Sequence, residues 1–440
     1  MKNKKIYGFV LLALIIMLLP IGMVSAKYKQ TKDVGTVTLD IAPPILSPTW
    51  HSELSQYGTI NKLIVDSFKN ESDQKKYSFL NWDEGVDVGY DPNNGNDFKN
   101  NVRLFVNNDT AYILAIGNNP VTFPQDSSYL FHDGWNHLYN IQEIEFNSVV
   151  TSNTENMSWM FFGCASLTSL NISSFNTSKV TDMNGMFVAC SSMTSLEFGD
   201  NFDTSKVINM SSMFDSCSAL ESLNVSCFDT SQVTNMNKMF NACKRLRTLD
   251  LSNFNTSKVI NMSTMFNNCE ELTSLDLGGF NTENVTNMSS LFGSCISLPN
   301  LDLSSFDTAK VADMSNMFYN CKTLVSLDLG SFNTEKVTNM NTMFRSCSNL
   351  TTIYVSNHWN VNNVNDSDFM FSGCDRIVGG NGTNYNRSHI GKDYARIDTQ
   401  DTPGYLTSIT EKPSTTSNIF SLVQEGGTII GTQITNSEEE

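Results

Sequence analysis

The sequence is poor in charged residues, in histidine and in the short motifs that mark catalytic sites. Only 17% of its 440 residues are Asp, Glu, Lys or Arg, and the formal net charge is -17. Such an acidic chain argues against nucleic acid or an anionic membrane as partner, because both attract clustered Lys and Arg. The 5 histidines are scattered, and G-x-S-x-G, H-E-x-x-H and glycine-rich phosphate loops do not occur. We therefore expect no enzymatic activity and no cofactor.

Long apolar runs are missing except at the N-terminus. Lys2, Lys4 and Lys5 precede an apolar run at residues 6–24, and small residues follow it up to Ala26. This order is typical of a secretory signal peptide cleaved after Ala26. An uncleaved membrane anchor is the alternative, because the run is close to the roughly 20 residues that span a bilayer. We expect an extracellular or cell-surface protein that meets a membrane only through this segment.

Cysteine is common and regularly spaced, at intervals of 26 or 27 residues. A fixed period of this length is the mark of stacked structural repeats. C-x-x-C pairs are absent, which argues against a metal site. Because equivalent positions lie one above another, we interpret the series as a buried, reduced ladder, with disulfides between neighbouring repeats as the alternative. Cys227 falls outside the series, whose members are Cys164, Cys190, Cys217, Cys243, Cys269, Cys295, Cys321, Cys347 and Cys374.

One repeat combines two hydrophobic periods. In residues 259–269 apolar side chains recur at helical steps, and a methionine is always among them, which favours a packed core. Leu272, Leu275 and Leu277 then form an L-x-x-L-x-L pattern whose last two members alternate as in a strand. Asparagines such as Asn209 suit caps that bond backbone amides between units. The sequence predicts an α/β solenoid with a parallel β-sheet on one face and short helical turns on the other.

The repeat resembles the leucine-rich repeat, and most of all the units of BspA-like bacterial surface leucine-rich repeat proteins. The phrase LTSLDLGGFNTENVTNMSSLFGSC at residues 272–295 carries this resemblance, and residues 377–407 resemble the segment that closes such arrays. The resemblance implies extracellular binding, as an adhesin for host matrix, glycans or other cells. A structural spacer or surface-layer component without a specific ligand is the alternative.

The chain is expected to contain a signal peptide (1–26), a small β-rich domain (27–128), a solenoid of about nine strands (129–378), a closing segment (379–407) and a linker with an acidic tail (408–440). Within the β-rich domain, residues 101–117 predict a hairpin around Asn107 and Asn108. A loop at residues 91–97 has some likeness to a calcium loop, but lacks the ligands of an EF-hand.

The predicted strands also expose a row of polar side chains, because the residue between the two inward apolar positions points outward. One interpretation is a solvated edge whose carboxylates bond Ser and Thr hydroxyl groups. The other is a ligand face that collects cations or basic groups of an extracellular protein or glycan. Calcium between successive aspartates is a further alternative. The candidate ligand-binding residues are Glu197, Asp250, Asp276, Asp302, Asp328 and Tyr354.

Overall fold

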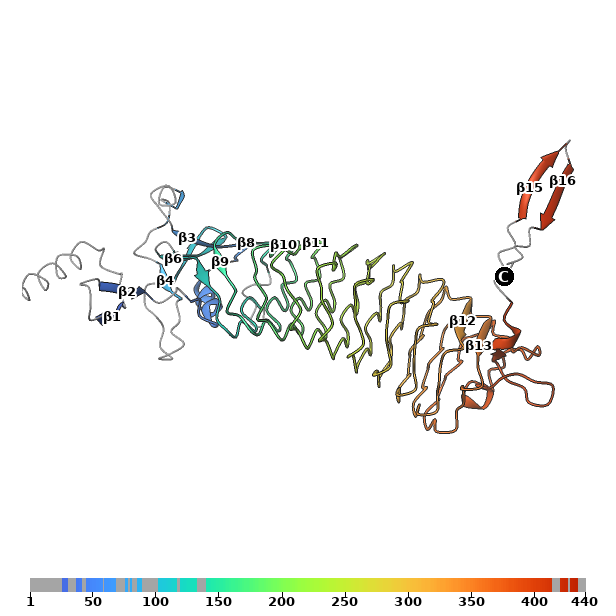
Figure 1. Cartoon of the computed structure of the whole chain (residues 1–440). Helices are drawn as coiled ribbons and strands as arrows, with labels where there is room; N and C mark the ends of the chain where they lie inside the picture. The colour runs from blue at the N-terminus through green and yellow to red at the C-terminus, as the bar shows by residue number, and fades with distance from the viewer. Residues whose placement is uncertain are drawn as a thin grey trace, which may run out of the picture.

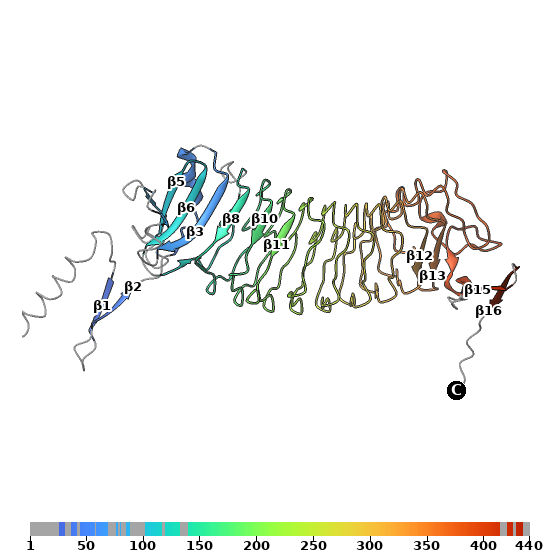
Figure 2. The same cartoon turned by 90° about the horizontal axis from the view of Figure 1, so that it is seen from above.

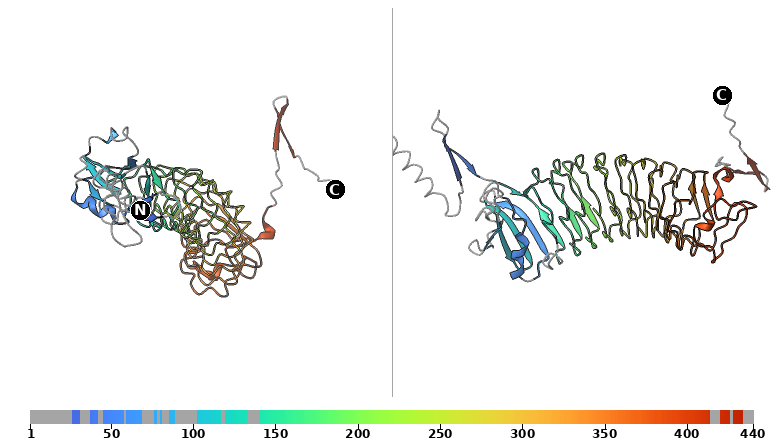
Figure 3. Two further views of the ribbon diagram at one scale, coloured as in Figure 1. Left: turned by 60° about the vertical axis from the view of Figure 1, so that its left-hand side comes forward. Right: turned by 90° about the horizontal axis from the view of Figure 1, so that it is seen from below.

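The computed structural model describes residues 26–30, 37–41, 45–57, 59–68, 76–77, 80, 85–88, 102–116, 119–132, 140–413, 420–425 and 428–433. The expected signal peptide up to residue 25 and the loop at 91–97 lie outside these residues. Figures 1 and 2 show the described chain as an elongated stack of coils, with the N-terminal strands at one end. Figure 3 shows residues 377–412 covering the opposite end.

The N-terminal strands and the first coils share one seven-stranded sheet, in the order β11-β10-β8-β3-β6-β5-β4. The central strand β3 pairs in parallel with both β6 and β8. The hairpin predicted at residues 101–117 is confirmed as the antiparallel pair β5–β6. The strands are β3 (Lys62–Phe68), β4 (Val86–Asp87), β5 (Val102–Asn107), β6 (Thr110–Ile116), β8 (Glu143–Phe146), β10 (Ser169–Asn171) and β11 (Ser195–Glu197).

The expected boundary at residue 128 is therefore not a break in the fold. Buried apolar side chains from Leu46 to Leu406 form one continuous cluster. The indole N–H of Trp50 donates to the carbonyl of Leu130 at 2.8 Å, so the segment before the array packs directly on its first coil. The N-terminal residues close the exposed end of the stack, as a capping unit of a solenoid must.

A second parallel sheet ends the array, in the order β12-β13-β14. Its last strand and the 3-10 helix η3 follow residue 406, so the closing segment extends beyond the expected boundary at 407. The elements are β12 (Ser326–Leu329), β13 (Thr352–Val355), β14 (Thr407–Ser408), η2 (Lys392–Tyr394) and η3 (Ile409–Glu411). The remaining elements are β1 (Ala26–Gln30), β2 (Val37–Ile41), η1 (Trp50–Gln56), β7 (Val121–Thr122), β9 (Val149–Val150), β15 (Phe420–Glu425) and β16 (Thr428–Gln433).

The solenoid and its parallel strands are confirmed, but the expected helical turns are not formed. No α-helix occurs between residues 140 and 413, a range that is described throughout. In one coil Ser212 and Ser216 have left-handed φ angles of 56° and 64°, which interrupt a right-handed helix. The amides of Ser212 and Phe214 donate to carbonyls of the next coil, at Asn237 (2.7 Å) and Met239 (2.9 Å). Alternate amides point along the stack, so they cannot form helical hydrogen bonds.

The core is built of side-chain ladders that run through all the coils. Neighbouring phenylalanine rings lie 5.4–6.0 Å apart and nearly parallel, and the ring of Tyr405 closes the series edge-on at 5.2 Å. The predicted burial of the methionines is confirmed, since Met262 and its equivalents are 0% exposed. The stacked rings are Phe131, Phe161, Phe187, Phe214, Phe240, Phe266, Phe292, Phe318, Phe344 and Phe371.

Candidate functional site

The candidate site is the side of the array that carries the strands and their equivalents in each coil, here called the strand face. Its outward side chains alternate with buried or partly buried leucines, and Glu197, Asp250, Asp276 and Asp302 are exposed. Asp328 and Tyr354 are partly exposed. The structure thus brings all six candidate residues onto one surface. They lie in successive coils, except that Asn224 occupies the equivalent position in the coil between Glu197 and Asp250. None of them lies in a closed cavity.

The aspartates of the strand face are held by backbone amides two residues further on. The Oδ1 atoms of Asp250, Asp276, Asp302 and Asp328 accept these amides at 2.9–3.0 Å. Asn171 makes the same turn at 2.9 Å, so the turn needs an oxygen acceptor and no charge. Hydrogen bonds from Ser252, first its backbone amide, lower the pKa of Asp250. Hydrogen bonds from Ser304, first from its hydroxyl group and then from its backbone amide, lower the pKa of Asp302. The carboxylates therefore bond both to backbone amides and to the serine hydroxyl groups expected from the sequence.

A lysine from a flanking element lies at each end of the acidic row. At one end Lys62 of β3 forms an ion pair with Glu143 at 3.0 Å and a second one with Glu145. The hydrogen bond to Glu145 is the largest effect that raises the pKa of Lys62. At the other end Lys412, just after η3, forms an ion pair with Asp328. Both ends of the row thus form ion pairs with a lysine from a segment distant in sequence, and at the first end one lysine pairs with two carboxylates.

The central carboxylates have no such partner. Among the described residues, no Lys or Arg lies within ion-pair distance of Asp250, Asp276 or Asp302. Glu197 accepts a hydrogen bond from the amide of Asn171 at 2.6 Å. No group of three or more His, Cys, Asp or Glu in the described part of the chain is arranged to hold a metal ion. The centre of the row is a series of exposed carboxylates without an ion-pair partner, and the charge of Lys412 contributes to the lowered pKa of Asp302 but not to that of Asp250.

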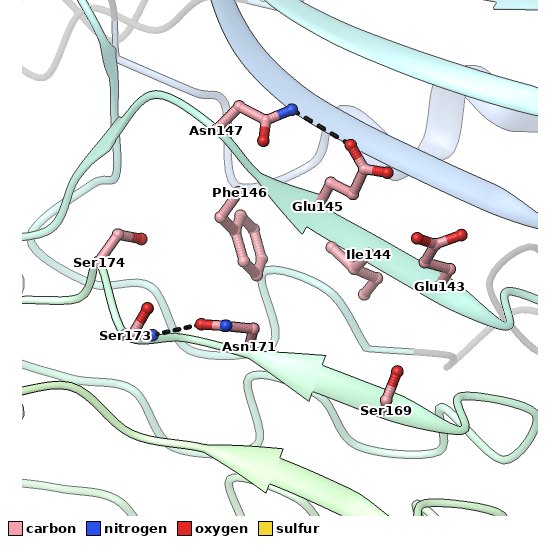
Figure 4. A pocket seen from close by; sticks show the side chains of 9 residues that line it. All are labelled: Glu143, Ile144, Glu145, Phe146, Asn147, Ser169, Asn171, Ser173 and Ser174. Atoms are coloured by element: carbon pink, nitrogen blue, oxygen red, sulfur yellow. Dashed lines mark hydrogen bonds between the residues drawn. The ribbon is translucent and has the colours of Figure 1, made fainter.

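Three hollows lie along this same face. The first, of about 320 Å³, is lined by residues of β8 and β10 that include Glu143, Glu145, Ser169 and Asn171. Figure 4 shows the side chains of Asn171 and Glu145 on either side of it, each held by a hydrogen bond. The other two, of about 520 and 290 Å³, open between the central coils and share Thr248 and Asp250. The strand face offers polar, open hollows rather than a deep pocket.

The central strand face keeps single backbone hydrogen bonds between coils, such as the amide of Thr273 to the carbonyl of Arg247 at 3.1 Å, but no paired strands. Strand pairing connects β8, β10 and β11, and again β12 and β13. Between Glu197 and Ser326, where every residue is described, no strand is formed. The structure therefore forms fewer strands in the array than the nine expected, and the gap includes the coil of Asn224 as well as those of Asp250, Asp276 and Asp302.

The predicted cysteine ladder lies inside the solenoid, away from this face. All nine members are buried and free, and Cys227 is exposed. Each sulfur donates to a phenylalanine carbonyl of the preceding coil at 2.9–3.2 Å, for example Cys269 to Phe240. Burial raises the pKa of Cys190 and Cys295 to about 12. The ladder is part of the core and touches no ligand surface.

Two further ladders were missed or misplaced by sequence reasoning. The buried hydroxyl of Thr256 donates to the carbonyl of Asn281 at 2.9 Å and accepts its amide at 2.8 Å, which connects neighbouring coils. The only sequence signal is a threonine two residues after a second series of buried phenylalanines, such as Phe254 and Phe280. The asparagines expected to bond between units instead close a turn within one coil, as Asn209 does with the amide of Ser211 at 3.1 Å.

Most of the repeat array matches the model of one protein family. Residues 125–215, 194–276 and 269–385 match the family model described as "Mycoplasma protein of unknown function, DUF285". The chain belongs to this family. The matched residues run from the first capping coil into the closing segment, so the family is defined by the array that carries the strand face. A comparison with curated proteins finds no match.

Two solved structures are similar to parts of the chain. The TLR13–ssRNA13 complex has 15% identity and a TM-score of 0.23, over 60% of this chain and 42% of that chain. A leucine rich cell surface protein from Faecalibacterium prausnitzii A2-165 has 14% identity and a TM-score of 0.21, over 77% of this chain and 95% of that one. The match thus spans less than half the length of the TLR13 chain. The chain's own coils establish its leucine-rich-repeat architecture.

Proposed function

We propose that the protein is a secreted or surface-located bacterial repeat protein of the BspA-like type, which binds an extracellular protein or glycan through its strand face. Binding of this kind would serve adhesion to host matrix or to other cells. The observation that supports it is the row of carboxylates without an ion-pair partner at Asp250, Asp276 and Asp302, exposed in consecutive coils. Solenoids present such extended surfaces to macromolecules.

We propose no catalytic role, because the strand face combines carboxylates with Ser, Thr and Asn but without a histidine or cysteine nucleophile among its outward residues. Among the described residues, none forms a helix long and apolar enough to cross a bilayer. Export is proposed on the N-terminal sequence alone, and accessibility of the array to antibody on intact cells would test it.

The test of binding is a panel of matrix proteins, glycans and whole cells probed with residues 27–440. The variant Asp250→Asn, Asp276→Asn, Asp302→Asn keeps the amide-accepting oxygens, because Asn171 and Asn224 already occupy this position in sister coils. Saturable binding that is lost in the variant supports the proposal. If the variant still binds, the site lies outside the strand face. If no panel member binds, the structural spacer is favoured.

A further inference from the structure

We propose that the array bends at one coil, residues 296–320, where Pro299 lets the strand side separate from both neighbouring coils while the other side stays bonded. This coil is here called the hinge coil. A hinge at this place is a property of the array itself and does not depend on what the strand face binds. Residues 140–413 are described throughout, so the hydrogen bonds on both sides of the coil are known.

One side of the hinge coil is attached to both neighbours by backbone hydrogen bonds. The amide of Phe318 donates to the carbonyl of Met343 in the following coil at 2.9 Å. The amide of Ser290 in the preceding coil donates to the carbonyl of Ser315 at 2.7 Å. The same pattern repeats in residues 209–216 and their equivalents along the array, here called the back ladder. The back ladder therefore passes through the hinge coil without interruption.

The strand side of the same coil, residues 296–306, has no backbone-to-backbone hydrogen bond to either neighbour. Side-chain hydroxyl groups make the contacts instead, at 2.9–3.1 Å. Ser305 donates to the preceding coil, and Thr323 and Ser331 of the following coil donate to the hinge coil. Because a hydroxyl group rotates about its bond, these contacts fix the spacing of the strand side less tightly than a backbone ladder does.

The sequence explains the gap, because Pro299 has no backbone N–H to donate. In sister coils the residue at this position bonds to the preceding coil. The amide of Thr273 donates to the carbonyl of Arg247 at 3.1 Å. The amide of Thr351 donates to the carbonyl of Val325 at 2.8 Å. A single proline thus removes one member of a ladder that holds most other coils together on the strand side.

Of the coils in residues 140–413, the hinge coil is the only one that lacks this bond on both sides. Pro299 cannot donate to the preceding coil, and Val325 of the following coil does not donate to Pro299. Glu221 also makes no bond to the coil before it, but its carbonyl accepts the amide of Arg247 at 3.2 Å. Loss of the bond on both sides leaves the strand side of one coil free to move as a unit.

The packing of the strand side is also looser here. Leu301 of the hinge coil is 9% exposed and Leu275 of the preceding coil is partly buried, whereas Leu327 and Ile353 in β12 and β13 are 1% and 0% exposed. Figure 2 shows strand arrows towards the two ends of the array and none between them. Local opening is drawn from regions with few buried contacts and few backbone bonds, so a bend belongs between the two paired sheets.

Amide hydrogen exchange of residues 27–440, read to single residues by mass spectrometry, measures this opening. Phe306 and Phe332 are matched reporters, because both follow a serine and both amides donate to the carbonyl three residues earlier at 3.0 Å. Phe332 follows the paired strand β12, so the amide of Phe306 should exchange about tenfold faster or more. The back-ladder amides of Phe318 and Phe344, each after a methionine and bonded at 2.9 Å, should agree within about threefold.

Pro299→Thr supplies the missing amide with the residue that sister coils carry. It should slow the exchange of Phe306 by about threefold or more and leave that of Phe332 unchanged. The matched control Pro403→Thr makes the same replacement in the closing segment and should change neither rate. It separates the hinge from the general effect of removing a proline from the unfolded chain.

Equal exchange of Phe306 and Phe332 would overturn the hinge. Fast exchange of Phe318 together with Phe306 would overturn it in favour of unfolding of the whole coil. An unchanged rate at Phe306 in Pro299→Thr, or the same slowing in Pro403→Thr, would show that the missing amide does not cause the opening and would overturn the inference as well.

Discussion

The threonine ladder allows a sharp test of what holds the coils together. The hydroxyl of Thr256 is buried, and it makes two hydrogen bonds to the backbone of Asn281 in the next coil, at 2.9 and 2.8 Å. Thr256→Val keeps the shape of the side chain but leaves a carbonyl and an amide of Asn281 without this partner. These hydrogen bonds are part-buried, and an intramolecular hydrogen bond contributes about 0.5–1.5 kcal/mol net. We therefore expect the loss of both to lower the free energy of unfolding by about 1–3 kcal/mol.

The matched control is Thr256→Ser, which keeps the hydroxyl and removes one buried methyl group, at a cost of about 1 kcal/mol. Denaturant unfolding followed by circular dichroism would compare the variants of residues 27–440. Because solenoids unfold in more than one step, the midpoint of the transition that reports the central coils is the quantity to compare. Equal stability of the valine and serine variants would refute the view that these hydroxyl groups connect the coils.

Three further predictions follow from single contacts. In the folded protein only Cys227 should react rapidly with Ellman's reagent, because the ladder cysteines are buried. Burial raises the pKa of Cys347 to about 12 and also raises the pKa of Cys217 and Cys269. Rapid reaction of several thiols would contradict the ladder. Thr264 has a left-handed φ of 63°, so Thr264→Asn should raise the free energy of unfolding by about 0.5–1 kcal/mol, and an unchanged midpoint would exclude strain there. Burial acts to raise the pKa of Asp398, but hydrogen bonds from Thr383, Gly404 and Asn381 outweigh it, and the net shift is downward. Because the pKa of Asp398 is lower in the folded state, its ionised carboxylate stabilises the closing segment fully above the unfolded pKa of about 3.9, and this stabilisation is lost as the pH falls through the folded-state pKa. In Asp398→Asn the free energy of unfolding should therefore decrease less on acidification.

The interior of the array was largely predictable, and the conformation of its coils was not. The period of the apolar residues and the spacing of the cysteines identified the stacked units. They also placed residues such as Met262 in the core, because equivalent positions of successive repeats are buried alike. The steps of three and four residues at 259–269 also fit a helix. What overrides the helix is the next coil, which takes the alternate amides as hydrogen-bond donors, and no single repeat contains that information.

The strand face was also predictable only in part. Its outward row was identified from alternation within each L-x-L, a local property. The lysines that pair with its ends were not, because Lys62 and Lys412 are separated from their partners by about 80 residues or more of chain. The threonine ladder was overlooked because a polar residue that recurs with the repeat also fits an exposed position, and its hydrogen bonds are made only to the next coil.

The sequence by itself determined that identical units must stack, which side chains they bury and which face carries the carboxylates, since all three follow from a repeat of fixed length with an apolar side. The tertiary structure alone decided that the coils turn without helices, that β3 continues the sheet of the array, and that the acidic row has lysine partners at its ends and no ion pairs at its centre. Those outcomes depend on hydrogen bonds and charges that meet only when distant segments are brought side by side.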